Sequence, residues 1–183
     1  MEPAGPDLLR LFVAVWPGPR ARRELARWMS AWTWPPGAST VAAARLHLTL
    51  AFIGPIEAVR VPGLIERLQL PFAPFQLDSG SAQRWPGGLA VLRLHRVPAE
   101  LTDLQERIAR AIETSGIRID GRPFVPHVTL ARRAPDAIAP PGTLHLDWPV
   151  RRFALVRSDA GRYTEVASFA CNEAGGSTPP CSR

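Results

Sequence analysis

Two pairs of histidine and threonine residues are the side chains in this sequence best suited to chemistry. His47 and Thr49 belong to the tetrad His-Leu-Thr-Leu, and His127 and Thr129 belong to the tetrad His-Val-Thr-Leu. Because the ordinary pKa of histidine is about 6.5, one imidazole can accept a proton near neutral pH while another donates one. Threonine hydroxyls can donate hydrogen bonds to phosphate oxygens. The two tetrads together predict acid–base chemistry on a phosphate group.

The opening of a cyclic phosphate diester needs both proton transfers. One group takes a proton from water, and another gives a proton to the departing ribose oxygen. A single His-x-Thr pair is weak evidence, because about one histidine in twenty is followed by such a threonine by chance. The alternative is that both histidines are ordinary strand residues beside threonines, which favour β structure. The repetition of the tetrad favours the catalytic interpretation.

Both tetrads fall in segments whose pattern predicts β-strands, at residues 46–52 and 124–131. In the first segment large apolar residues alternate with smaller or polar ones, which is the period of a half-buried strand. We therefore expect its core face to consist of Leu46, Leu48, Leu50 and Phe52. Side chains of a strand alternate between its faces, so each histidine should project from the same face as its threonine. The same alternation places Arg132 on the opposite face from His127, unless the strand ends or twists before it.

The elements around the tetrads follow a similar order in the two halves of the chain. Apolar patterns and breaks at Gly or Pro predict helices over residues 19–32, 64–70 and 98–115. They predict further strands over residues 10–15, 72–77, 89–95, 144–148, 152–158 and 163–169. The first motif strand is expected to stop at Gly54-Pro55, and residues 78–88 are expected to form turns. The order of strand, helix and motif strand resembles a degenerate duplication.

Length and composition indicate a globular protein. The 183 residues can bury a substantial core, and 46% of them are hydrophobic. No apolar stretch approaches the roughly 20 residues needed to cross a bilayer, and residues 1–7 lack the pattern of a secretory signal. Cys171 and Cys181 lie near the C-terminus and form neither a disulfide framework nor a zinc motif. We therefore expect a cytoplasmic protein without a membrane partner.

The charge of the chain favours a phosphate-rich partner. The 22 basic residues outnumber the 16 acidic residues, which gives a net charge of +6, and the basic residues are arginines. The planar guanidinium group of arginine matches phosphate oxygens, so RNA or a nucleotide is the expected partner. A general bias toward arginine for solubility is the alternative.

Other candidate residues have weaker patterns. His95 and His145 lack the threonine and lie among charged or polar neighbours, which favours surface positions. The His-Thr spacing is not a chelating pattern, so neither a metal nor another cofactor is expected. The absence of a Gly-rich phosphate loop from the sequence argues against an ATP-dependent RNA ligase. Trp34 and Trp85, beside proline, are candidate platforms for a nucleobase.

Several stretches of the sequence resemble one known family. They are Arg-Leu-Phe-Val-Ala-Val at residues 10–15, Arg-Leu-His-Leu-Thr-Leu-Ala-Phe-Ile-Gly at 45–54, Gly-Arg-Pro-Phe-Val-Pro-His-Val-Thr-Leu-Ala-Arg at 121–132, and Ala-Leu-Val-Arg-Ser at 154–158 with Tyr163. From about residue 9 to residue 169 the chain resembles the two-histidine (2H) phosphoesterase superfamily. Within it, the RNA 2′,3′-cyclic phosphodiesterases, also called 2′-5′ RNA ligases, are the most similar branch.

The resemblance implies an α+β fold of two similar lobes, each an antiparallel sheet with outer helices, around a central cleft. Each lobe would supply one motif to the cleft. We therefore expect one two-lobed domain over residues 8–171 and a monomer. The composition of the C-terminal segment, rich in Gly, Ser and Pro, predicts a disordered tail over residues 172–183.

The resemblance also implies roles for five residues. His47 would donate a proton to the ribose 3′ oxygen, and His127 would accept a proton from water, so that the phosphate stays on the 2′ oxygen. Thr49 and Thr129 would hold the phosphate, with Arg132 as a further anion contact. The reaction would also run in reverse as 2′-5′ ligation. The alternatives are a phosphodiesterase for 2′-5′ oligonucleotides or small cyclic nucleotides, and a non-catalytic RNA-binding module.

Overall fold

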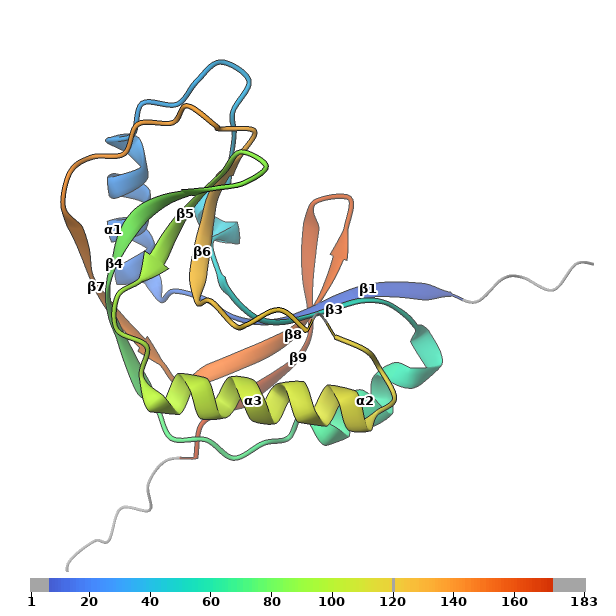
Figure 1. Ribbon diagram of the computed structural model, residues 1–183. Helices are drawn as coiled ribbons and strands as arrows, with labels where there is room; N and C mark the ends of the chain where they lie inside the picture. Colours follow the sequence, from blue (N-terminus) through green and yellow to red (C-terminus); the bar gives the residue numbers. More distant parts are fainter. Residues whose placement is uncertain (1–6, 120, 173–183) are drawn as a thin grey trace, which may run out of the picture.

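The computed structural model describes residues 7–119 and 121–172, which form one curled antiparallel sheet with three α-helices (Figure 1). The strands are β1 (Leu8–Val15), β2 (Ser39–Thr40), β3 (Leu48–Glu57), β4 (Phe75–Trp85), β5 (Leu89–Leu94), β6 (His127–Arg132), β7 (Thr143–Val150), β8 (Arg152–Asp159) and β9 (Arg162–Ala170). The helices are α1 (Pro19–Ser30), α2 (Val61–Arg67) and α3 (Ala99–Thr114). In the described part of the chain, no helix combines the length and apolar character needed to span a membrane.

The sheet has two halves that meet at one residue pair. Its strand order is β7-β4-β5-β6-β3-β1-β8-β9, with β2 paired to β6. The central strands β3 and β6 pair at Leu48 and Val128, and Figure 1 shows the two halves set at a steep angle. The expected α+β fold with antiparallel sheets is thus confirmed, and the two sheets are continuous through this central pair.

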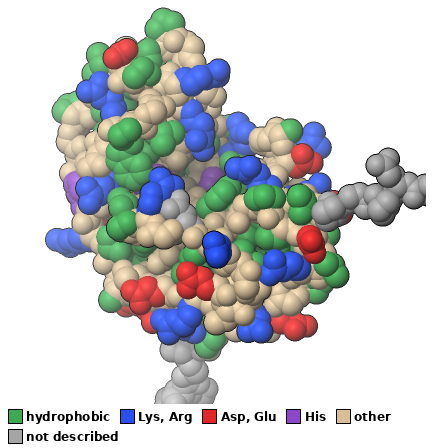
Figure 2. Space-filling view, turned by 45° about the vertical axis from the view of Figure 1, so that its right-hand side comes forward, with side chains coloured by type: hydrophobic (Ala, Val, Ile, Leu, Met, Phe, Trp, Pro, Cys, Tyr) green, Lys and Arg blue, Asp and Glu red, His purple; other side chains and the backbone are tan. Residues whose placement is uncertain are grey.

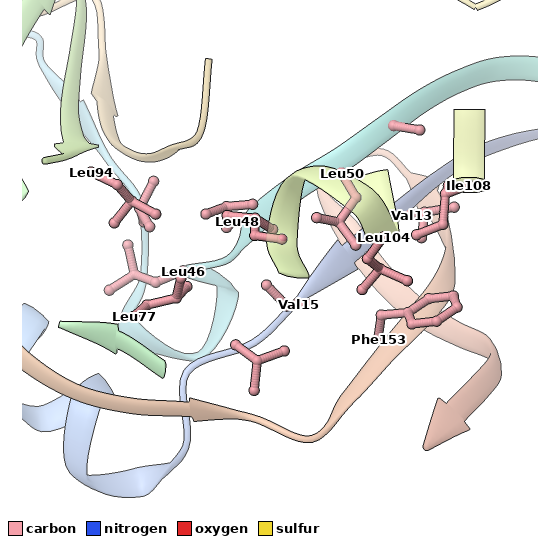
Figure 3. Packing of buried hydrophobic residues seen from close by; sticks show 14 of the residues in the cluster. Val13, Val15, Leu46, Leu48, Leu50, Leu77, Leu94, Leu104, Ile108 and Phe153 are labelled. Atoms are coloured by element: carbon pink, nitrogen blue, oxygen red, sulfur yellow. The ribbon is translucent and has the colours of Figure 1, made fainter. Parts of the chain in front are cut away.

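Each long helix packs on the half of the sheet opposite to the strand that precedes it in sequence. Helix α1 follows β1 but contacts β7, whereas α3 lies between β5 and β6 in sequence but contacts β3. Figure 3 shows Leu104 and Ile108 of α3 close to Leu50, Val13 and Phe153. Leu104 and Ile108 are fully buried, as the helical spacing of apolar residues requires. This exchange of helices joins the two halves into a shared core.

Strand β3 is longer than predicted, because it continues through Gly54-Pro55 to Glu57. Gly54 adopts a φ of 79°, and a bulge beside it carries the strand past this point. At Pro55 the strand pairs with β1 through Arg10, and the described residues include no partner on its other side there. Proline is tolerated in such an edge position. The predicted stop was therefore wrong.

Residues 78–88 were also predicted wrongly as turns. Most of this stretch belongs to β4, which pairs with β5 on one side and β7 on the other. Pairing on both sides overrides the low strand propensity of Gly and Ser in this segment. Only residues 86–88 form the turn, where Gly87 and Gly88 have φ values of 78° and 72°.

The remaining elements match the predictions apart from their ends, except the short strand β2, which was not predicted. Strands β3 and β6 begin at Leu48 and His127, later than expected, so His47 lies immediately before its strand. The predicted C-terminal tail and Cys181 lie outside the described residues, except Asn172, whose backbone N–H donates to Phe72 O at 3.0 Å.

Candidate active site

The two tetrads lie side by side where the halves of the sheet meet. Because β3 and β6 run antiparallel with Leu48 opposite Val128, the register brings His47 toward Thr129 and Thr49 toward His127. A cavity of about 390 Å³ is lined by His47, both threonines and Arg132. An adjoining cavity of about 620 Å³ is lined by His127 and Thr49. We call these two cavities together the cleft.

The two imidazoles have matching hydrogen bonds. His47 Nδ1 lies 2.6 Å from Arg45 O, and His127 Nδ1 lies 2.8 Å from Val125 O. A carbonyl oxygen can only accept, so each Nδ1 carries a proton and donates it. In the neutral form of each ring, Nε2 is therefore the atom that can accept a proton. The backbone carbonyl two residues before each histidine therefore fixes the same tautomer in both rings.

His47 is surrounded by aromatic rings from distant parts of the chain. Its ring centroid lies 5.1 Å from that of Phe12, 5.2 Å from that of Trp16 and 5.4 Å from that of Tyr163. Burial among them lowers the pKa of His47, and the hydrogen bond to Arg45 O partly opposes this. Positive charge on His127 and Arg132 lowers the pKa of His47 further.

His127 contacts a single aromatic ring among the described residues, that of Trp85, with 4.4 Å between centroids. Burial is the main cause that lowers the pKa of His127, and the nearby charge of Arg132 adds to it. The hydrogen bond to Val125 O acts in the opposite direction. Both imidazoles are therefore biased toward the neutral form.

Arg132 lies on the cleft side of β6, where strict alternation would not place it. The ladder between β5 and β6 pairs Ala90 with Ala131 and Val91 with Thr129, so Leu130 is an extra residue in a β-bulge. Leu130 and Ala131 are consequently both buried. The bulge returns Arg132 to the face of the motif, where it lines the cavity beside His47 and the two threonines.

The first motif contains the same irregularity. In the ladder of β1 with β3, Leu50 is the extra residue, since Ala14 pairs with Thr49 and Val13 with Ala51. Leu50 and Ala51 are both buried, and the next residue, Phe52, keeps 47% of its surface exposed. Phe52 thus occupies in the first motif the place that Arg132 occupies in the second. The prediction that Phe52 faces the core was wrong, because the bulge shifts the alternation by one residue.

Phe52 lines both cavities of the cleft, and the guanidinium carbon of Arg10 lies 5.1 Å from the centre of its ring. The strand pattern gave no sign of this role, or of the contact of Phe12 and Trp16 with His47, although Phe12 and Phe52 lie in stretches that resemble the family. Tyr163 is the sole tyrosine of the chain. It belongs to a resembling stretch, which was the available signal for it.

Of the other predicted candidates, Trp85 lies in the cleft and the rest lie outside it. His95 and His145 are exposed, as expected. Trp34 stacks on Trp32 with 4.8 Å between ring centroids and does not line the cleft, whereas Trp85 does. Among the residues that the structure describes, no group of three or more His, Cys, Asp or Glu side chains could hold a metal ion. Figure 2 shows a histidine in a hollow of the surface with arginine side chains on either side.

The fold and the cleft define a two-histidine protein in which each half of a curled antiparallel sheet supplies one His-x-Thr motif. The chain belongs to the 2′-5′ RNA ligase superfamily, whose family model matches residues 17–162.

Individual relatives are similar to this chain over most of their length. The RNA 2′,3′-cyclic phosphodiesterase of Escherichia coli is 31% identical over 173 residues, covering 90% of this chain and 97% of the relative. A protein of the same name from Thermus thermophilus is 34% identical over 82% of each chain. The crystal structure of E. coli LigT complexed with 3′-AMP has a TM-score of 0.83 and 29% sequence identity, covering 91% of this chain and 100% of that chain.

Proposed function

We propose that this protein hydrolyses the 2′,3′-cyclic phosphate ends of RNA or oligonucleotides to 2′-phosphomonoesters. The observation that carries the proposal is the pair of histidines, each with Nδ1 held by a carbonyl and each lining the same cleft. The two curated relatives are RNA 2′,3′-cyclic phosphodiesterases, and the crystallised LigT holds 3′-AMP, a ribonucleotide monoester. These names support the same reaction for this chain.

In the proposed reaction, His127 accepts a proton from water through Nε2 as the water attacks phosphorus. His47, protonated at Nε2, gives its proton to the departing 3′ oxygen. The assignment of donor and acceptor follows the family resemblance, because the two motifs have equivalent hydrogen bonds. The nucleophile and the leaving oxygen of an in-line displacement lie on opposite sides of phosphorus, as the two histidines would.

Thr49, Thr129 and Arg132 are proposed to hold the phosphate between the histidines. All three line the cavity with His47. The positive charge of Arg132 stabilises the negative charge of the phosphate oxygens, and the threonine hydroxyls donate hydrogen bonds to them. A bound phosphate also opposes the effect of Arg132 on the imidazoles, since a negative charge raises the pKa of a nearby histidine. Bound substrate would therefore raise the pKa of His47 and favour the protonated form that donates the proton.

The experiment that tests the function is hydrolysis of a 2′,3′-cyclic mononucleotide in buffer containing EDTA, with the product identified by phosphorus NMR. We expect turnover to persist in EDTA, because the proposed proton transfers involve only imidazoles. We expect the 2′-monoester as product, because His47 protonates the 3′ oxygen. Turnover that disappears in EDTA and returns with a divalent ion would contradict the proposed metal-independent mechanism. A dominant 3′-monoester would overturn the assigned orientation of the substrate.

A further inference from the structure

A further cavity of about 720 Å³, outside the two that form the cleft, adjoins the cleft on the side of His47. We call it the arginine groove. Its lining consists of a few small residues together with Trp16, Arg22, Arg45, Arg152, Arg162, Tyr163 and the acidic Glu165. The groove and the cavity around His47 share Arg45, Gly161 and Tyr163. The two spaces are therefore continuous, and a ligand in the cleft can extend into the groove.

The groove has more positive charge than its own acidic residue can balance. Glu165 pairs with Arg152 at 2.6 Å. Within the described residues, no carboxylate lies within ion-pair distance of Arg22, Arg45 or Arg162. An unbalanced group of arginines beside a site for phosphate chemistry is suited to further phosphates.

Arg22 and Arg45 are held in place without being neutralised. Arg45 Nη1 donates to Gly161 O at 2.7 Å, which ties the β8–β9 turn to the segment before β3. Arg22 Nη2 donates to Pro17 O at 3.3 Å. Arg22 Nε is buried, and no described residue accepts a hydrogen bond from it. A buried donor without a partner is costly unless a ligand or water satisfies it.

Aromatic rings lie where the groove meets the cleft. Trp16 stacks on His47 with 25° between the ring planes, and Tyr163 meets the same imidazole edge-on. Both residues also line the groove. Aromatic faces beside cationic side chains are the combination that binds single-stranded nucleic acid, because bases stack while phosphates pair with the charges.

The direction of the RNA follows from the proposed roles of the histidines, on which this inference rests. If His47 protonates the departing 3′ oxygen, the ribose of the terminal nucleotide lies on the His47 side of the phosphorus. The preceding nucleotides are attached to the same ribose through its 5′ oxygen and leave on that side. The arginine groove is the space that continues from there.

We propose that the arginine groove binds the strand upstream of the cyclic phosphate, with Arg22 and Arg162 on backbone phosphates and Trp16 beside a base. The preferred substrate is then an oligoribonucleotide with a 2′,3′-cyclic end, and a cyclic mononucleotide is a truncated substrate that leaves the groove empty. The preference resides in the groove, outside the residues that perform the chemistry.

The test compares kcat/KM for a cyclic mononucleotide and for a hexaribonucleotide that ends in the same cyclic nucleotide. For the unaltered protein we expect at least a tenfold higher kcat/KM for the hexamer and a steeper salt dependence. Arg22→Ala with Arg162→Ala should remove most of this advantage and leave mononucleotide turnover within about twofold. The slope of log kcat/KM against log salt for the hexamer should fall by about 1.4, since each phosphate contact on a single strand contributes about 0.7.

The matched control is Arg23→Ala with Arg27→Ala, which removes the same charge from exposed positions on α1 outside the groove. It should retain the preference for the hexamer. Arg162→Glu alone is a second variant, because Arg162 is exposed beside the β8–β9 turn and its replacement spares the core. It should also reduce turnover of the hexamer selectively.

Two results would overturn the proposed role of the groove while leaving the proposed function intact. One is an equal kcat/KM for both substrates, and the other is an equal loss of the hexamer preference in the control variant Arg23→Ala with Arg27→Ala. Turnover of neither substrate by the unaltered protein would overturn the proposed function, and the groove with it.

Discussion

At the scale of single residues, the two histidines are equivalent in their hydrogen bonds but not in their surroundings. Three aromatic rings contact His47, whereas Trp85 is the aromatic contact of His127 in the described structure. Burial lowers the pKa of each, and Arg132 adds to the effect on both. The two histidines and Arg132 are therefore electrostatically coupled, and removal of the charge of Arg132 should raise the pKa of both histidines.

His47→Ala and His127→Ala should each reduce turnover by about 10²- to 10⁴-fold, the usual contribution of general acid–base catalysis. Because the two residues act in one step of the proposed mechanism, the double variant should lose less than the product of the single effects. The measurement is steady-state kinetics on a cyclic nucleotide, with folding checked by circular dichroism. His95→Ala is the control, since His95 is exposed and outside the cleft. Near-normal turnover by folded His127→Ala would refute the paired mechanism.

Arg132→Gln should move the pH profile of kcat/KM to higher pH. The charge of Arg132 lowers the pKa of both histidines, so its removal raises both. The acidic limb, where the base must lose its proton, and the basic limb, where the acid must keep its proton, should therefore shift in the same direction. Arg110→Gln, at an exposed position on α3, should leave both limbs unchanged. An unshifted pH profile in Arg132→Gln would show that the charge of Arg132 does not lower the pKa of the two histidines.

At the scale of elements, the site depends on irregular strands. The bulges at Leu50 and Leu130 place Phe52 and Arg132 at equivalent positions on the cleft side. The carbonyl of Leu130 accepts a hydrogen bond from the N–H of Val41 at 2.7 Å, next to the short strand β2. This bond satisfies a polar group that the bulge would otherwise leave without a ladder partner.

Strand β4 can be tested through Gly80. A Cβ atom at this position would lie 2.6 Å from Arg93 O and 2.9 Å from a methyl group of Leu92. Gly80→Ala should therefore destabilise the fold by about 1–3 kcal/mol, as other overpacked sites do. Gly63→Ala on α2 meets no atom within 4 Å and should be neutral or stabilise by up to about 1 kcal/mol. Denaturant unfolding of both variants makes the comparison, and an undiminished stability of Gly80→Ala would contradict the close packing of β4 with β5.

At the scale of the whole molecule, the two halves share one main core. Its buried residues include Leu11 and Phe153 from one half of the sheet and Leu77 and Trp148 from the other. Helices α1 and α3 each pack on the half opposite to the strand that precedes them in sequence. Such mutual support favours a single cooperative unit, although the sheet itself is joined at one residue pair.

We therefore expect the protein to unfold in one transition. Far-UV circular dichroism and tryptophan fluorescence should give the same midpoint and the same slope in denaturant. Leu104→Ala, which removes a fully buried side chain of α3, should lower the midpoint by both probes together and cost about 2–5 kcal/mol. Two separated transitions would show that the halves fold independently.

The two motifs, the main helices and most of the strands could be predicted from the sequence. Histidine and threonine two residues apart share a strand face whatever the strand pairs with, and the apolar spacing of α1 and α3 is a local property. Other features could be found only in the folded chain. They are the bulges, the cleft side of Arg132 and Phe52, and the rings of Phe12, Trp16 and Tyr163 around His47. These features arise from the pairing of strands that are distant in the chain, and the local period of one strand carries no information about the register of its neighbours.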